Sequence, residues 1–421
     1  MVRRIAHAYR DAYSGLSTEV WVLSTALFIN RSGAMVIAFL TLYLTQRLGF
    51  TMLEAGAIFS VYGLGAIVGG YIGGRLVQPL GAVRVQILGL VLSVPIYILI
   101  PTLTTWTSVA AGMFVLNLSL GGTYPASGVA IAQFTDASLQ TRAFGLQRMA
   151  CNLGWAIGPA IGGILAEIDY ALLFFVNGTT TGAAGLFLFW FFGFRRYAKG
   201  DASAQRQKQA EQKDNSSGSP LLDRHFLCFL FLMLLVAVVF FQFHTTYPKY
   251  LEDEYALTKP QIGLMFSLNT AIIVVFEMLL VNYVSRFSLL RAIGWGCFFA
   301  CLGFGMLPAS HATWFAVLSM TVITSGEMFM FPLASGFVAA RSNGRNQGMY
   351  MSWYAMTYSL AGVVAPLIGT AVYQWGHNLF WYASLGVGTF VLVGLTWLSK
   401  QVDSVPLKLR QDHVRDIGEL V

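Results

Sequence analysis

Five ionisable residues stand inside long apolar stretches of the sequence: Arg31, Arg148, His244, Glu277 and Glu327. If those stretches cross a membrane, each charge costs about 2.5–3.5 kcal/mol on insertion scales, which makes each residue a candidate functional group. A carboxyl in such surroundings is expected to exchange a proton near neutral pH, because desolvation disfavours its charged form. A guanidinium keeps its charge and can hold an anion.

The elements that carry these residues are expected to be membrane-spanning helices. The composition, 56% hydrophobic and 11% charged, is typical of a membrane protein and excludes an ordinary soluble domain. Twelve apolar stretches have about the 20 residues that cross a bilayer, at roughly 20–45, 53–74, 85–104, 107–134, 143–166, 170–194, 226–248, 261–284, 290–308, 314–339, 349–373 and 378–399. The sequence therefore predicts an all-α membrane protein with 12 transmembrane helices. The first has no cleavage site after it and is expected to remain in the mature protein.

Basic residues predict the orientation of these helices. With both termini in the cytoplasm, the inner segments hold 21 of the 26 Lys and Arg residues, and the outer loops hold only Arg47, Lys249 and Lys259. This asymmetry favours cytoplasmic N- and C-termini and an even number of crossings. The net charge of +7 then reflects the inner membrane face, and no basic patch with interleaved aromatic residues indicates nucleic-acid binding.

The stretch Gly145–Gly163 has small residues at every fourth position, which form a smooth stripe along a helix: Ala150, Gly154, Gly158, Gly162 and, just beyond the stretch, Ala166. Pro159 lies within the stripe and is expected to bend the helix. The spacing of Gly145, Gly154, Gly158-Pro159 and Gly162-Gly163 resembles the fifth-helix antiporter motif of the drug:proton exporters in the major facilitator superfamily. An ordinary packing face of small residues is the alternative.

The sequence also contains a weak internal repeat. A shift of 207 residues aligns several glycine, serine and proline positions on the two sides of the polar segment 195–224. The aligned pairs include Gly56 with Gly263, Ser60 with Ser267, Gly154 with Ala361, Gly158 with Ala365, Pro159 with Pro366 and Gly162 with Gly369. Their order along one offset indicates duplication of a six-helix unit.

The resemblance implies two six-helix bundles around a central cavity that opens alternately to each side of the membrane. The predicted organisation is an N-terminal bundle at 1–194, a cytoplasmic linker at 195–224, a C-terminal bundle at 225–400 and a cytoplasmic tail at 401–421. The first, fourth, seventh and tenth helices would line the cavity. The fifth and eleventh, bent at Pro159 and Pro366, would meet the partner bundle with smooth faces.

The family's other motifs are degenerate in this sequence. In the turn between the second and third helices, the glycines and Arg84 agree with the superfamily signature, but Gln78 replaces the expected aspartate and Pro79 a basic residue. In the fourth helix, Asn117 stands where the similar exporters carry an arginine. The first helix is slightly similar to that of the proton-coupled peptide transporters, but Leu27 and Asn30 replace their two glutamates.

The resemblance places Arg31 and Glu327 on cavity-lining helices. Glu327 is predicted to bind a coupling proton, and Arg31 to hold an anionic or hydrogen-bonding part of a substrate, or to pair with Glu327 when no substrate is bound. Arg148 and Glu277 are predicted to form a salt bridge across the bundle boundary that replaces the missing cytoplasmic charges; alternatively, Arg148 extends to the lipid headgroups.

Other polar residues of the spans are weaker candidates. His244 could take part in proton coupling, or could be a hydrogen-bonded structural residue near Gln242 and Tyr247. Candidate substrate contacts beside Arg31 are Asn30, Asn117, Tyr124, Gln242 and Asn269. Tyr124 and Asn117 belong to a segment that also fits a simple packing kink.

The sequence thus predicts a secondary active transporter, a proton-coupled exporter of small amphipathic or weakly anionic molecules. The alternatives are a proton-coupled importer or facilitator of peptides or organic anions, and a receptor on the same fold that moves no substrate. The expected partners are a small-molecule substrate, protons and the lipid bilayer, and the expected location is a bacterial inner membrane, as a monomer.

Several other functions lack the residues that they need. No phosphate-binding glycine loop occurs, and no His, Cys and carboxylate cluster has metal-ligand spacing, so the sequence predicts no enzyme, cofactor or metal site. Four cysteines fall in predicted spans and are expected to be free packing thiols: Cys151, Cys228, Cys297 and Cys301.

Overall fold

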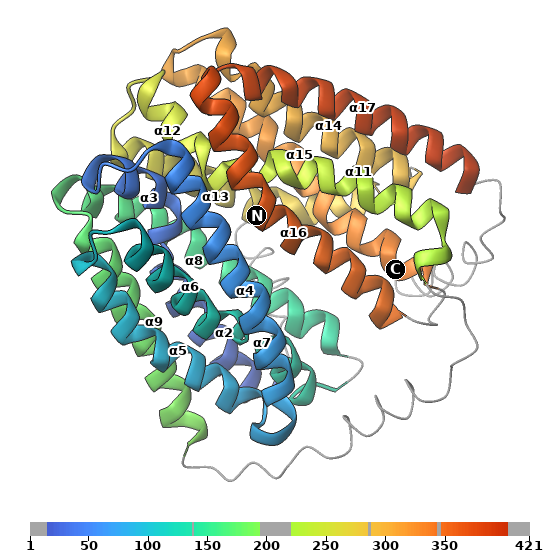
Figure 1. Ribbon diagram of the computed structural model, residues 1–421. Helices are drawn as coiled ribbons and strands as arrows, with labels where there is room; N and C mark the ends of the chain where they lie inside the picture. Colours follow the sequence, from blue (N-terminus) through green and yellow to red (C-terminus); the bar gives the residue numbers. More distant parts are fainter. Residues whose placement is uncertain (1–14, 137–138, 194–219, 285–287, 343–346, 403–421) are drawn as a thin grey trace, which may run out of the picture.

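The computed structural model describes residues 15–136, 139–193, 220–284, 288–342 and 347–402, and these ranges are helical with no β-strand (Figure 1). The elements of the N-terminal half are α2 Thr18–Ser32, α3 Val36–Leu42, η1 Tyr43–Arg47, α4 Met52–Leu80, α5 Ala82–Leu99, η2 Ile100–Thr102, α6 Trp106–Gly121, α7 Thr123–Gln133, α8 Gln140–Ile168 and α9 Ala171–Phe192. Those of the C-terminal half are η4 Pro220–Leu222, α11 Arg224–Phe240, η5 Phe241–His244, α12 Thr246–Asp253, α13 Lys259–Val284, α14 Leu289–Met306, η6 Leu307–Ala309, α15 Thr313–Arg341, α16 Gln347–Trp375 and α17 Leu379–Val402. Most of the predicted linker and tail lies outside the described residues.

Eleven helical segments in the described ranges are long and apolar enough to cross a membrane. They coincide with eleven of the twelve expected stretches. The remaining stretch, 107–134, is occupied by α6 and α7, which are separated at Gly122 and are each too short to count alone. The chain is therefore an all-α, multi-pass membrane protein, and twelve crossings remain a prediction.

The first predicted span is broken near its middle, and the seventh in its last third. The first is interrupted between α2 and α3 at residues 33–35, and the seventh passes through the 3₁₀ segment η5 between α11 and α12. At the first break Gly33 packs closely on α9, where a side chain would collide with Thr180. Neither break was expected from the hydropathy of the sequence, which is continuous through both.

The boundaries of α4 follow from its end residues. Thr51 caps the helix in a capping box with Glu54, whose carboxylate accepts a 2.8 Å hydrogen bond from the Thr51 backbone N–H. The helix continues through Pro79 and ends at Gly81, which has φ +88°. A residue with a side chain is strained at this φ, so glycine allows α4 to be followed directly by α5. The turn between the second and third predicted spans is thus a single residue.

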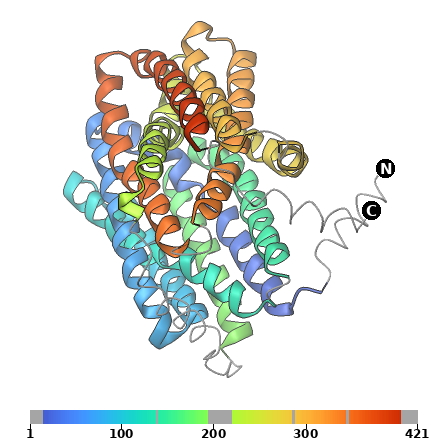
Figure 2. The ribbon, with the colours of Figure 1, turned by 90° about the vertical axis from the view of Figure 1, so that its right-hand side faces the viewer.

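Most helix contacts lie within the two halves of the chain. In Figures 1 and 2 the helices α2–α9, coloured blue to green, gather on one side of the molecule, and α11–α17, coloured yellow to red, on the other. Contacts between the halves come mainly from α4 with α16 and from α8 with α13. The predicted fifth and eleventh spans, α8 and α16, therefore lie at the boundary between the halves.

Residues of the internal repeat make equivalent contacts at this boundary. A side chain at Gly56 of α4 would place its Cβ 2.8 Å from the carbonyl oxygen of Pro366 in α16. In the same way, a Cβ at Gly263 of α13 would collide with the carbonyl group of Pro159 in α8. These two glycines and two prolines are the pairs related by the 207-residue shift. The halves thus meet twice through the same glycine-on-proline packing.

The glycine stripe of α8 has a different neighbour from the one predicted. A Cβ at Gly154, Gly158 or Gly162 would meet residues 31–39 of the first span, in the same half. The α8 contact with the other half is made instead by Pro159 and by Gly163, whose Cβ would lie 2.7 Å from the Cα of Pro260. The stripe of small residues on α8 therefore packs against the first span, and another side of α8 contacts the C-terminal half.

We expect Gly63→Ala to destabilise the boundary between α4 and α16. The added Cβ would lie 2.9 Å from the carbonyl oxygen of Gly362, so the two helices must move apart. Overpacking of this kind costs about 1–3 kcal/mol, which should lower the melting temperature of the purified protein. Gly74→Ala is the control, because nothing lies within 4 Å of its Cβ. Equal melting temperatures for the two variants would contradict this packing.

Candidate functional site

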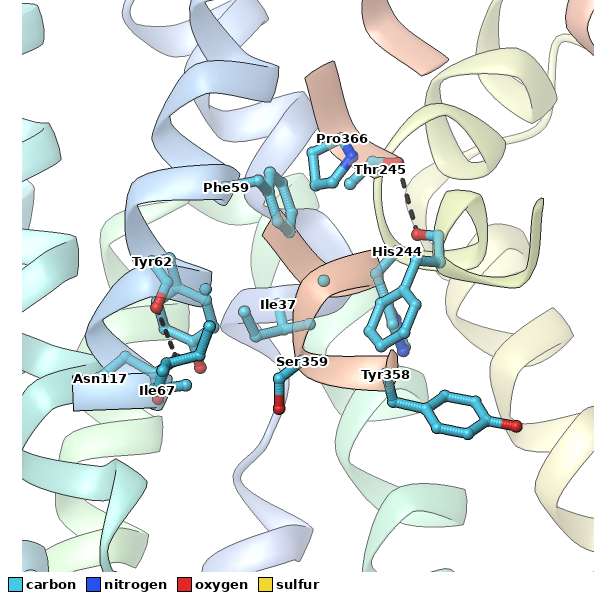
Figure 3. Close-up of a pocket in the computed structure, with 14 residues that line it drawn as sticks. Ile37, Phe59, Tyr62, Ile67, Asn117, His244, Thr245, Tyr358, Ser359 and Pro366 are labelled. Carbon is cyan, nitrogen blue, oxygen red and sulfur yellow. Dashed lines mark hydrogen bonds between the residues drawn. The ribbon is translucent and has the colours of Figure 1, made fainter. Parts of the chain in front are cut away.

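A central cavity of about 310 Å³ lies between the two halves (Figure 3). Its walls come from the first span, α4 and α6 on the N-terminal side and from η5 and α16 on the C-terminal side. The lining residues are mostly apolar or aromatic: Ile37, Phe59, Tyr62, Gly63, Ala66, Ile67, Asn117, Phe241, His244, Thr245, Tyr358, Ser359, Gly362 and Pro366. The volume is at the lower end of the range of small-molecule sites, about 300–1,000 Å³.

Arg31 lies next to the N-terminal wall of this cavity, in the last turn of α2. It is close enough to Tyr62 and Tyr97 to act electrostatically on both hydroxyl groups. Its Nε is buried without a hydrogen-bond partner, and the guanidinium forms no ion pair with a described residue. The partial negative charge at the C-terminal end of α2 offsets part of the cost of this cation.

A small polar cluster of the N-terminal half lies beside Arg31. Asn30 donates a 3.1 Å hydrogen bond from Nδ2 to Oγ1 of Thr181 in α9, and Asn177 donates one of 3.4 Å to the same oxygen. Asn177 and Thr181 are buried. Because this hydrogen bond joins α2 to α9 one residue before Arg31, the cluster fixes the helix end that carries the guanidinium.

Glu327 lies in α15 and pairs with a neighbouring helix of the C-terminal half. Asn269 of α13 donates from Nδ2 to a Glu327 carboxylate oxygen at 2.8 Å and to Oγ1 of Thr324 at 2.9 Å. Asn269 is buried and Glu327 is partly buried. Glu327 belongs to the C-terminal half and Arg31 to the N-terminal half. The structure contains no ion pair between them, so the two groups are held separately in this conformation.

The structure separates the remaining predicted ligand contacts. Asn117 and His244 line the cavity, and Asn117 donates a 2.9 Å hydrogen bond from Nδ2 to the backbone oxygen of Tyr62. Tyr124 is 62% exposed and does not line the cavity. Gln242 is fully buried, and its amide is used within the protein by Val238, Ala365, Thr245 and Thr246. Tyr124 and Gln242 therefore do not line this cavity, and their contact with a substrate stays a prediction.

The predicted gating residues are only partly described. Arg84 is exposed in the first turn of α5, and Arg148 is exposed in α8. The side chain of Glu277 lies outside the described residues, so the Arg148–Glu277 pair stays a prediction. Pro366 lies both in the cavity wall and at the boundary between α16 and α4.

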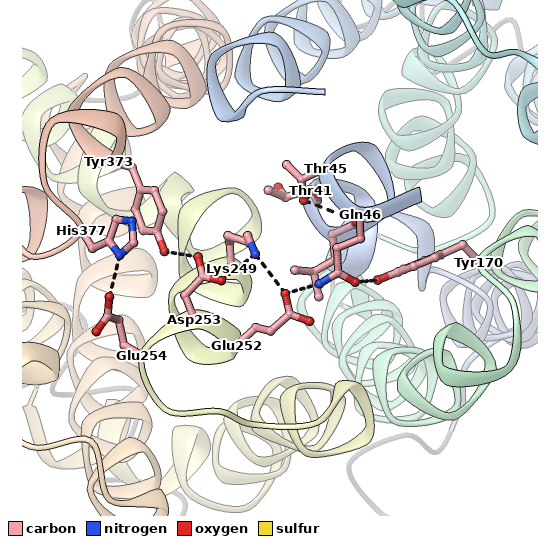
Figure 4. Close-up of polar contacts among 11 residues, drawn as sticks. Thr41, Thr45, Gln46, Tyr170, Lys249, Glu252, Asp253, Glu254, Tyr373 and His377 are labelled. Atoms are coloured by element: carbon pink, nitrogen blue, oxygen red, sulfur yellow. Dashed lines mark hydrogen bonds and ion pairs between the residues drawn. The ribbon is translucent and has the colours of Figure 1, made fainter. Parts of the chain in front are cut away.

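At one end of the molecule, polar side chains join the two halves (Figure 4). Gln46, at the end of the first span, accepts a 2.6 Å hydrogen bond from the Tyr170 hydroxyl and donates one to Glu252 of α12. Lys259 of α13 donates to the carbonyl oxygen of Ala166 at 3.3 Å and lies 4.5 Å from the centre of the Tyr170 ring. We call this the closed end.

Further polar contacts at the closed end stay within the C-terminal half. Lys249 bonds to Glu252 at 3.2 Å and to Asp253 at 2.6 Å. Burial alone would lower the pKa of Lys249, but its hydrogen bond to Asp253 and the charges of Asp253 and Glu252 outweigh this effect and raise the pKa. Lys249 therefore stays charged near neutral pH and holds Glu252 in position for Gln46.

An ion pair at the opposite end of the C-terminal half joins its helices to each other. Asp223 caps α11 and accepts hydrogen bonds from Arg341 of α15 at 2.8 and 3.0 Å. Burial alone would raise the pKa of Asp223, but the hydrogen bonds from Arg341 and from the Phe226 backbone N–H outweigh it and hold the pKa below its usual value. This pair stabilises one half and does not link the two.

The closed-end network was missed at the level of the sequence. From the sequence, Lys249 is assigned to an outer loop and neither Glu252 nor Asp253 is singled out, although their i, i+3 and i, i+4 spacing predicts ion pairs on a helix. Their link to Gln46 and Tyr170 had no signal in the sequence, because those residues are far away along the chain and uncharged. The free state of the four cysteines, in contrast, agrees with the prediction.

Two halves with equivalent packing, a cavity between them and contacts that close one end are the architecture of a secondary transporter. Comparison with known proteins agrees. The model of the Major Facilitator Superfamily matches residues 22–258 and 245–418. The chain belongs to this superfamily, which confirms the resemblance seen in the fifth-helix motif, and it is a transporter and not an enzyme.

Relatives in sequence are distant but cover most of the chain. The uncharacterized MFS-type transporter YttB of Bacillus subtilis is 23% identical, over 83% of this chain and 86% of the relative. The quinolone resistance protein NorA of Staphylococcus aureus is 21% identical, over 88% of this chain and 94% of the relative.

Solved structures share the fold. A peptide transporter POT in complex with sulfate aligns with a TM-score of 0.76 at 15% identity, covering 92% of this chain and 96% of the other. The nucleoside transporter NupG aligns with a TM-score of 0.70 at 14% identity, covering 92% and 98%. Because these identities are low, the alignments show a common fold and do not indicate a substrate.

We expect Glu252→Ala to loosen the closed end. The experiment uses Ser359→Cys as a reporter in the cavity wall, with the four native cysteines replaced, and an impermeant thiol reagent added at the closed end. Loss of the bond to Gln46, worth about 0.5–1.5 kcal/mol, should speed labelling roughly two- to tenfold. Glu254→Ala is the control, because its 2.6 Å contact with His377 stays within one half. Equal labelling rates in the two variants would show that Glu252 does not hold this end closed.

Proposed function

We propose that the chain is a proton-coupled exporter of small amphipathic or weakly anionic molecules that works by alternating access. The observation that carries this proposal is the unpaired guanidinium of Arg31, held at a helix end beside a cavity between two halves. A cation without a partner among the described residues is suited to an anionic group of a ligand. The largely apolar cavity is suited to the rest of such a molecule.

We further propose twelve crossings, with α6 and α7 together forming the fourth and with both termini in the cytoplasm of a bacterial cell. The excess of basic residues in the segments at the opposite end from Gln46 supports this orientation. The closed end then faces outward, and the described conformation is the inward-facing state, ready to take substrate from the cytoplasm.

The proposed proton site is Glu327. Its carboxylate is partly buried in α15 and accepts a hydrogen bond from Asn269 of α13, so a change in its protonation alters a contact between two helices of the C-terminal half. The proton would enter from outside when the closed end opens and leave to the cytoplasm in the described state. Arg31 and Glu327 would then serve substrate and proton on separate halves of one cavity.

Export is favoured by a relative in sequence, because NorA is named for resistance to quinolones, and a transporter can produce resistance by removing a drug from the cell. Import of peptides or organic anions is the second candidate, and Arg31 is the residue that supports it. Uptake into right-side-out and inverted vesicles under the same pH difference separates these two directions. Binding without flux in either preparation would favour a receptor.

Arg31→Ala is expected to abolish binding of an amphipathic anion. Naphthalene-2-sulfonate is a suitable probe, because its charge does not depend on pH and it does not cross bilayers readily. We expect a thermal shift of the purified full-length protein with the probe, no shift in Arg31→Ala, and a smaller one in Arg31→Lys, which keeps the charge but loses the planar fork. An unchanged shift in Arg31→Ala would contradict the assignment of Arg31.

Glu327→Gln is expected to uncouple transport from the proton gradient. The glutamine can still accept the hydrogen bond of Asn269 but carries no titratable proton. In proteoliposomes, exchange of labelled for unlabelled naphthalene-2-sulfonate should continue, whereas accumulation driven by a pH difference should fall to the level without a gradient. Glu327→Asp, which keeps a carboxyl, should retain part of the accumulation. Gradient-driven accumulation by Glu327→Gln at the wild-type level would exclude Glu327 as the proton site.

A further inference from the structure

His244 is a cavity-lining residue whose hydrogen-bonding groups have no partner in the described protein. It is the last residue of η5 and lies across the cavity from Tyr62 in Figure 3. Its Nδ1 is buried and unpaired, and neither ring nitrogen bonds to another described residue. A buried polar group without a partner costs about 1–3 kcal/mol, so its presence here needs an explanation.

Among the described residues, the contacts recorded for the imidazole are with aromatic rings. Phe266 of α13 lies parallel to it, with an angle of 3° between the rings and 6.0 Å between their centres. Trp155 of α8, in the other half, lies 5.7 Å away, and Phe243 contacts it edge to face at 5.2 Å. These rings fix the orientation of His244 but leave both nitrogens unpaired among the described residues. Nδ1 is shielded, so Nε2 is the nitrogen that a polar group of a molecule in the cavity can reach.

The rest of the cavity is suited to a flat, apolar molecule. Phe59 and Tyr62 of α4 line one side, and Phe241 and Tyr358 line the other. Aromatic side chains recognise flat rings by stacking and edge-to-face contact. Arg31 belongs to the same half as Tyr62 and acts on it electrostatically. An anionic group held by Arg31 would therefore leave the ring of the same molecule on the Tyr62 side of the cavity, across from His244.

We propose that His244 is a substrate-specificity residue, which forms a hydrogen bond with a polar group at the far edge of a planar aromatic anion. The ring occupies the aromatic part of the cavity, and the anionic group is held by Arg31, so this inference rests on the proposed function. A neutral imidazole has one donor and one acceptor nitrogen. A ring hydroxyl can serve as either partner, which makes it the group of choice at this edge.

A matched pair of probes tests this inference. Naphthalene-2-sulfonate and 6-hydroxynaphthalene-2-sulfonate differ by one hydroxyl at the end of the ring system opposite the sulfonate. Their dissociation constants are measured by calorimetry on the full-length protein in lipid nanodiscs, without a proton gradient. We expect wild type to bind the hydroxylated probe about tenfold more tightly, which corresponds to about 1.4 kcal/mol for one buried hydrogen bond.

Two variants separate hydrogen bonding from packing. His244→Phe keeps a ring against Phe266 and Trp155 but has no polar atom, so it should bind both probes with equal affinity, near that of wild type for the unsubstituted probe. His244→Gln places an amide near the position of the imidazole edge and should restore part of the preference. Melting temperatures of both variants, compared with wild type, show whether the fold is kept.

Three results would overturn the inference: no preference for the hydroxylated probe in wild type, a preserved preference in His244→Phe, or binding of neither probe to wild type. The proposed function fails in a different way. A wild-type protein that shows the preference but moves neither probe under a pH difference would refute proton-coupled transport of these anions and would leave the role of His244 in recognition intact.

Discussion

Close approach of backbone to backbone at two equivalent places is the constraint on which this structure depends. Gly56 lies against the Pro366 carbonyl, and Gly263 lies against that of Pro159. In lipid, helices gain little from hiding apolar side chains, so they associate where small residues let their backbones pack. A proline in each partner helix bends it and removes one internal hydrogen bond. The two contacts join halves with few side chains between them, which suits halves that must change their relative orientation.

The same geometry explains where the candidate site lies. The small residues of α8 pack against the first span, and those of α16 pack against the seventh. In α16, Gly369 lies against the side chain of Gln242, whose amide donates a 2.7 Å hydrogen bond to the backbone oxygen of Ala365. Both of these spans are interrupted, Arg31 lies just before the first break, and His244 at the second break lines the cavity. Broken helices with polar groups at their ends are a recurrent way to build a binding site in the middle of a membrane.

Much of this fold could be predicted from the sequence, because the signals are local. Hydropathy located the spans, and the spacing of Gly154, Gly158 and Pro159 identified the family. The helix breaks could not be predicted, because the hydropathy is continuous through both and the close contact of Gly33 with Thr180 joins residues far apart along the chain. The roles of single polar residues are hard to predict for a related reason. Gln242 looks like a ligand contact in the sequence, but whether its amide is already paired depends on a helix more than 100 residues away.

The positions of Arg31 and Glu327 limit how a proton could be coupled to a substrate. Arg31 belongs to α2 and is tied through Asn30 to α9, whereas Glu327 belongs to α15 and is tied through Asn269 to α13. Because the two groups are not paired, a proton on Glu327 cannot displace a substrate from Arg31 by breaking a shared salt bridge in this conformation. In the proposed mechanism each group instead biases the same movement of the halves, the substrate from the N-terminal side and the proton from the C-terminal side. Coupling through a shared conformational equilibrium requires only that each ligand binds the two states with different affinity.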